Sequence, residues 1–108
     1  MFEAYWGQAL HVARVAARLS QDEVLTELNK RTSRVISLVL LDGMEKDIEE
    51  INAETFDAWC ELLPQGKTKV LKCAQFLQQN AHRPEQELLE ELRRELEYRQ
   101  WKPQAENQ

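Results

Sequence analysis

The chain has 108 residues, 43% of them hydrophobic, so it is long enough for one domain with a core and too short for two ordinary domains. Three glycines and three prolines are too few for the frequent turns of an all-β protein, and no run of eighteen apolar residues would span a membrane. The N-terminus lacks a basic region followed by an apolar stretch, so we expect no secretory signal and a cytoplasmic location.

The net charge of −5 is unevenly distributed along the sequence. Residues 1–41 are nearly balanced, whereas residues 42–61 carry eight acidic side chains and a single lysine. Residues 62–83 hold four cations and no acid, and residues 84–108 are again acidic. A polyanion such as DNA would therefore have to approach a limited part of the surface.

Hydrophobic periodicity predicts helices from the start of the chain. Apolar residues recur at steps of three and four, which indicates a first helix over about 2–18. The segment SQDE at 20–23 has the form of a capping box and should begin a second helix that runs to about Leu28. We expect Asn29 to form the turn after it, because asparagine tolerates the left-handed conformation.

Thr32 or Ser33 is expected to cap a third helix formed by the apolar segment RVISLVLL, and Gly43 to end it as a C-cap glycine. The same reasoning predicts a fourth helix over about 53–63 and a fifth over about 67–80. Pro84 suits the first position of a last helix that continues to about 101. The expected organisation is a helical domain over 1–80, a C-terminal helix over 84–101 and a disordered tail over 102–108.

The sequence lacks the residue patterns of a catalytic or metal site. Cys60 and Cys73 form no C-x-x-C pair, and we expect two reduced, largely buried thiols. His11 and His82 have no zinc-ligand spacing, and the sequence contains no phosphate-binding glycine loop or G-x-S-x-G segment. We therefore expect no enzymatic activity, no cofactor and no metal.

The order of the predicted helices resembles a known family. Residues 19–28, LSQDEVLTEL, resemble the start of the phage repressor/Cro-type helix-turn-helix family, whose pattern reads like L-S-Q-E-E-L-A-E-x-L-G. ISLVLLDG at 36–43 resembles the family's recognition helix and closing turn, and INAETFDAWCELL at 51–63 is similar to its fourth helix. The resemblance covers about residues 8–63. It implies an all-α fold, a compact helical domain with a helix-turn-helix core and additional C-terminal helices.

In this family the third helix lies in the major groove and the second abuts the DNA backbone. The resemblance therefore implies that Gln21 contacts a phosphate and that Lys30 and Arg31 supply further phosphate contacts. The side chains that would face base edges are Thr32, Ser33, Arg34 and Ser37. An arginine in such a place can pair with both acceptors of a guanine. The alternative interpretation is that these residues form the solvated, capped start of a helix.

Several residues depart from the family pattern. Leu25 stands where the family has a small residue, and in the stretch 35–41 only Ser37 is polar, although a groove-reading helix needs a polar face. The acidic residues of 42–50 would lie near the DNA backbone and repel it. The cations that could compensate, unless they form a merely solvated helix face, are Lys67, Lys69 and Lys72.

The last predicted helix carries a leucine stripe that docks on the chain's own core or pairs with a second copy in a homodimer. Its polar face allows the i,i+4 pairs Glu90–Arg94 and Glu95–Arg99. The candidate partner-binding residues of the chain are Leu38, Leu41, Leu92, Leu96, Tyr98 and Trp101.

Two functions follow from the sequence. One is a helix-turn-helix DNA-binding transcriptional regulator of the repressor/Cro type, with duplex DNA as its partner. The other is a protein-interaction adaptor, or an antitoxin- or anti-repressor-like module, that keeps the scaffold without groove reading. Its partner would be a protein, which could be basic because the acidic segment would attract it.

Overall fold

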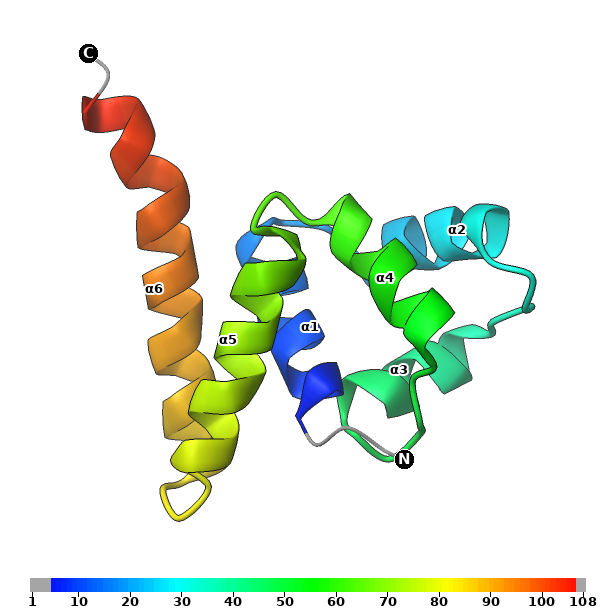
Figure 1. Ribbon diagram of the computed structural model, residues 1–108, viewed down its shortest axis with the longest axis horizontal. Helices are drawn as coiled ribbons and strands as arrows, with labels where there is room; N and C mark the ends of the chain where they lie inside the picture. Colours follow the sequence, from blue (N-terminus) through cyan, green and yellow to red (C-terminus); the bar gives the residue numbers. More distant parts are fainter. Residues whose placement is uncertain (1–4, 107–108) are drawn as a thin grey trace.

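A central helix, α1 (Trp6–Ala16), organises the computed structural model, which describes the backbone of residues 5–106 and the side chains of residues 5–96. Helices α3 to α6 all contact α1, and α2 packs against α3 and α4. Figure 1 shows α5 and α6 on one side of α1 and α2 to α4 on the other. All regular structure in the described part of the chain is helical, which confirms the predicted all-α fold.

The small residues of α1 bring its neighbours close. Leu10 and the alanines of this helix are almost completely buried. Gly7 lies so close to α3 that a Cβ atom placed on it would be 1.7 Å from the carbonyl oxygen of Met44. Contact at this point therefore requires glycine. The helix ends at Ala16, two residues earlier than predicted, where Arg18 takes up a left-handed conformation with φ of 62°.

Helix α2 (Gln21–Arg31) begins with the predicted capping box. The Ser20 hydroxyl accepts from the Glu23 amide at 3.0 Å, and the Glu23 carboxylate accepts from the Ser20 amide at 2.9 Å. The helix continues past Leu28, so the prediction that Asn29 forms a turn is wrong. The Asn29 side chain instead accepts from the amide of Ile36 at 2.7 Å and donates to its carbonyl at 3.0 Å. These bonds fix the connection that follows α2.

Helix α3 (Leu38–Glu45) is displaced from its predicted position. Its N-cap is Ser37, whose hydroxyl accepts from the Leu40 amide at 3.1 Å, and not Thr32 or Ser33. Gly43 lies inside the helix and is not the predicted C-cap. The chain folds back over Gly43, so that a Cβ atom placed on this glycine would be only 2.7 Å from Cγ of Glu49.

Helices α4 (Ala53–Leu62) and α5 (Gly66–Gln79) lie within one residue of the predicted positions. Asn52 caps α4 by accepting from the amide of Thr55 at 2.8 Å. The largest buried side chain, Trp59, comes from α4, and Phe56 of the same helix stacks on Trp6 of α1 with ring centroids 4.0 Å apart. These contacts join α4 to α1 through the core.

Helix α6 (Glu85–Glu106) begins directly after Pro84. It continues past position 101, although the sequence analysis predicted that the helix ends near 101 and that a disordered tail follows. Leu88, Leu92 and Leu96 are buried in the common core, so the helix docks on its own chain. Leu92 and Leu96 are therefore not available to a partner, which corrects their assignment to a partner surface. The side chains of Tyr98, Arg99 and Trp101, and with them the Glu95–Arg99 pair, lie outside the described ones.

Both cysteines are buried free thiols, as predicted. Burial raises the pKa of the Cys60 thiol to about 12 and that of the Cys73 thiol to about 11. Both groups therefore stay protonated near neutral pH and are poor nucleophiles. Within the described part of the chain, no helix is long and apolar enough to cross a membrane. No group of three metal-ligating side chains is placed there to hold an ion.

Candidate functional site

The residues predicted to face DNA lie in the connection between α2 and α3 and not on a helix. Thr32 ends α2 in an extended conformation, and its hydroxyl donates to the carbonyl of Leu28 at 2.9 Å. Ser33 and Arg34 follow in the same connection, which Ser37 closes as the cap of α3. These four side chains therefore do not share the helix face that the family resemblance implied.

The cations at the end of α2 lie beside carboxylates. Lys30 is 3.5 Å from Glu27, and Arg31 is 3.5 Å from Glu27 and 3.3 Å from Glu61. All of these side chains are at least partly exposed, so each pair contributes little to stability. A DNA phosphate would have to compete with Glu27 and Glu61 for both cations.

The half-buried side chain of Gln21 is bonded to α3. Its side-chain amide donates to Asp42 and to Glu45 of α3, each at 3.1 Å. A phosphate at Gln21 would have to compete with these two carboxylates for its amide group.

The start of α3 exposes three apolar side chains. Val35 is 92% exposed, Val39 83% and Leu38 44%, and we call these three residues the α3 apolar surface. Leu41, two residues after Val39, is completely buried, which corrects the prediction that it would face a partner. Figure 1 shows this end of α3 and the connection from α2 at the edge of the molecule.

Two acidic side chains are linked to the residues around the α3 apolar surface. Glu54 accepts a hydrogen bond at 3.1 Å from the hydroxyl of Ser33, which precedes Val35 by two residues. Asp42 lies one turn after Leu38 and pairs with Lys46 at 2.9 Å. Hydrogen bonds from Lys46 and Gln21 lower the pKa of Asp42, so its carboxyl group is charged at neutral pH.

A buried ion pair holds the other end of α3 against α1. Arg14 contacts both carboxylate oxygens of Glu45, at 2.5 and 3.0 Å, and also donates to the carbonyl of Leu19 at 2.8 Å. The Nδ1 atom of His11 lies 2.9 Å from the same carboxylate. Burial alone would raise the pKa of Glu45, but the hydrogen bonds from His11, Arg14 and Gln21 and the charge of Arg14 together outweigh it and lower the pKa. Glu45 is therefore an ionised, internally satisfied carboxylate.

Asp47 caps α1 from a distant part of the chain. Its carboxylate accepts from the amides of Gly7 at 2.8 Å and Gln8 at 3.0 Å, which are unsatisfied donors of the first turn of α1. Tyr5, the local N-cap residue, makes no side-chain cap of its own. Burial raises the pKa of Asp47, and the two amide bonds only partly offset this effect.

The acidic segment after α3 is thus mainly a structural element. Asp42, Glu45 and Asp47 have partners within the fold, and sequence reasoning treated all of them as a solvated acidic loop. It also missed Arg14, although a charged residue among the alanines and leucine of an amphipathic helix indicates a buried ion pair.

The chain matches no protein-family model, no curated protein and no solved structure. Its function must therefore be inferred from its own residues. The exposed apolar side chains at the start of α3 are a feature that the fold itself does not use.

Proposed function

We propose that the chain is a protein-interaction module whose α3 apolar surface binds a partner protein. The observation that carries the proposal is the exposure of Val35 and Val39, which lie within five residues of each other and are almost completely in contact with water. Burying a valine side chain contributes about 1.5–3 kcal/mol, so two of them with Leu38 form a useful binding anchor. Large exposed apolar side chains that are close together in the chain are candidates for an interaction site.

The partner is expected to combine apolar and basic side chains. The carboxylates of Glu54 and Asp42 belong to residues bonded or close in the chain to the α3 apolar surface, through Ser33 and one helical turn after Leu38. Carboxylates around an apolar centre favour a partner that presents cations around an apolar anchor. Such charges mainly increase the association rate and the specificity of binding.

The α3 apolar surface is held in place before a partner arrives. Asn29 fixes Ile36 by two hydrogen bonds, and Ile36 is 2% exposed, so the residue next to Val35 is anchored in the core. The Ser37 cap then sets the start of α3. Binding to a pre-organised surface loses little conformational entropy, which favours affinity.

DNA binding is the second candidate, as a transcriptional regulator of the repressor/Cro type. It is supported by the capping box of α2 and by the cations Lys30, Arg31 and Arg34 before α3. It is weakened by the carboxylates beside Lys30 and Arg31 and by the apolar start of α3. We therefore rank it below the protein-interaction module.

The substitution Val39→Lys separates the two candidates. It adds a cation at an exposed position, so a DNA-binding protein should bind duplex DNA more tightly, while binding of a basic, apolar partner should weaken. Ile48→Lys is the matched control, because Ile48 is 75% exposed and lies beyond the other end of α3. Circular dichroism should show the same helix content in all three proteins.

Two measurements complete the experiment. Peptides selected from a displayed random library on the wild-type chain should carry lysine or arginine beside apolar residues and should bind Val39→Lys at least about tenfold more weakly, whereas Ile48→Lys should bind them normally. Mixed-sequence duplex DNA is titrated at low and at physiological salt. Tight, salt-sensitive DNA binding that Arg31→Ala and Arg34→Ala abolish would replace our proposal by the second candidate. Light scattering that detects a dimer dissociated by Val39→Lys would identify a second copy as the occupant instead of a foreign protein.

A further inference from the structure

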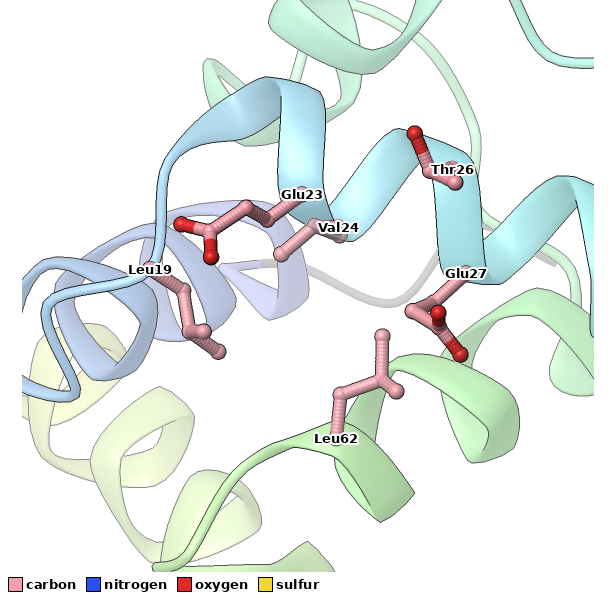
Figure 2. Close-up of a pocket in the computed structure, with 6 residues that line it drawn as sticks. All are labelled: Leu19, Glu23, Val24, Thr26, Glu27 and Leu62. Carbon is pink, nitrogen blue, oxygen red and sulfur yellow. The ribbon is translucent and has the colours of Figure 1, made fainter.

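A hollow lies between α2 and the C-terminal end of α4. Its volume is about 330 Å³, and the residues that line it are Leu19, Glu23, Val24, Thr26, Glu27 and Leu62. Figure 2 shows Leu62 pointing toward α2, with Glu23 and Glu27 extending from successive turns of α2 toward Leu19 and Leu62. The volume is at the lower end of the range for ligand pockets, so it suits one long side chain and not a large cofactor.

The inner wall of this hollow, the α2–α4 groove, is apolar. Val24 is 1% exposed, and Leu19 and Leu62 are partly buried side chains packed against the core. None of these three residues offers a side-chain hydrogen-bonding group. Thr26 adds little polarity, because its hydroxyl donates to the carbonyl of Asp22 in its own helix at 2.9 Å. The wall therefore favours methylene groups.

The outer rim of the groove is acidic. Among the described residues that line it there is no lysine, arginine or histidine. The Glu23 carboxylate accepts a hydrogen bond from the Ser20 amide at 2.9 Å, and a carboxylate can accept up to about four such bonds. Glu27 is 3.5 Å from Lys30 and from Arg31, which are long contacts to exposed cations of the next turn. Two carboxylates with unused acceptor capacity thus border an apolar wall.

We propose that the α2–α4 groove binds an arginine side chain presented by a peptide segment of a partner protein. The methylene stem would pack on Val24 and Leu62, and the guanidinium would donate to Glu23 and Glu27. Residues four apart on a helix have Cβ atoms about 5–6 Å apart, a spacing that the two edges of a planar guanidinium can bridge. Lysine fits less well, because it is a strongly hydrated point charge without a fixed fork of donors.

This site is independent of the α3 apolar surface. It is built from α2 and α4, and its recognition rests on one cation in an apolar groove and not on exposed valines. Either site can therefore fail its own test without affecting the other.

The test uses a blocked dipeptide, acetyl-leucyl-arginine amide, titrated into the ¹⁵N-labelled protein and followed by amide chemical shifts. Its control replaces arginine by citrulline, which has the same shape and no charge. We expect the shifts to concentrate at residues 19–27 and at Leu62, and citrulline to bind about tenfold more weakly, because a charge-assisted hydrogen bond is lost.

Two variants test the rim. Glu27→Gln and Glu23→Gln should each weaken arginine binding severalfold, and glutamine at position 23 preserves the capping box. Glu50→Gln, which removes an exposed carboxylate outside the groove, should leave binding unchanged. Equal affinity for arginine and citrulline, shifts centred outside the groove, or an effect of Glu50→Gln as large as that of Glu27→Gln would overturn the proposal.

Discussion

The two ends of α3 differ in how they use their side chains. At the C-terminal end, charged residues are held by partners within the fold: Arg14 binds Glu45, and Asp47 caps α1. At the N-terminal end, Val35 and Val39 are apolar and exposed to water. The contrast teaches that the composition of a segment does not decide whether it is structural or available for binding. The partners that the fold supplies to each side chain decide it.

The largest effect is expected from breaking the buried ion pair at the C-terminal end. Arg14→Ala leaves the Glu45 carboxylate buried without its main cation, which should lower the free energy of unfolding by about 3–5 kcal/mol. Urea denaturation followed by circular dichroism measures the change. Lys46→Ala breaks an exposed pair with Asp42 and should have a much smaller effect. Equal losses in the two variants would show that burial does not distinguish these pairs.

A pair of leucines sharpens the comparison within α3. Leu41→Ala removes a completely buried side chain and should cost about 2–5 kcal/mol in the free energy of unfolding. Leu38→Ala removes the same atoms from a position that is 44% exposed, so it should cost less than half as much. The same urea titration compares the two variants. A larger loss for Leu38→Ala would mean that the α3 apolar surface belongs to the core.

The capping role of Asp47 should have a smaller effect. Asp47→Gly removes the carboxylate from the start of α1 and should lower the free energy of unfolding by about 1 kcal/mol. Glycine is chosen because Asp47 has a φ of 58°, which glycine adopts without strain. Glu50→Ala, at a nearby exposed acid, is the control. A stable Asp47→Gly variant would show that the lost bonds are offset, either by other groups at the first turn of α1 or by relief of the left-handed backbone at position 47.

The pH dependence of stability should separate Glu45 from Asp47, and we expect this to be the smallest of the four effects. The pKa of Glu45 is lowered from 4.5 in the folded state, so its ionised form stabilises the fold above pH 4.5, and this stabilisation is lost as the pH falls through the folded pKa. The pKa of Asp47 is raised from 3.8 in the folded state, so its protonated form stabilises the fold at low pH. This stabilisation is lost as the pH rises from 3.8 through the folded pKa, which is the opposite pH dependence to that of Glu45.

Urea denaturation between about pH 3 and 6 measures both contributions. In Glu45→Gln the free energy of unfolding should decrease less than in the wild type as the pH is lowered. In Asp47→Asn it should decrease more steeply. Parallel pH profiles for the wild type and both variants would contradict these assignments.

Local sequence patterns predicted most of the helices because their causes are local. The capping box at Ser20 and Glu23, the proline before α6 and the leucines at 88, 92 and 96 are each read within a few residues. The position of α3 could not be read in this way. Thr32, Ser33 and Ser37 are all good N-cap residues. In the structure Ser37 caps α3, and the residue before it, Ile36, is held by two hydrogen bonds to the side chain of Asn29.

The internal partners of the acidic segment depend on contacts between distant residues. Arg14 and Glu45 are 31 positions apart, and Asp47 caps an amide 40 positions away, so periodicity contains no information about either contact. The exposed start of α3 was easier to anticipate. A single polar residue within the stretch 35–41 already indicated that some apolar side chains would face outward, although it did not show that Leu41 was buried and Val39 was not.

The missing side chain of Gly7 has a consequence for how the molecule tolerates change. Met44 occupies the space that even a methyl group on Gly7 would need. In a library that contains every amino acid at every position, selection for folded protein should leave glycine alone at position 7, at the very beginning of the first helix. The least permissive position of this chain would then be its smallest residue, and a bulky label attached there would separate α1 from α3.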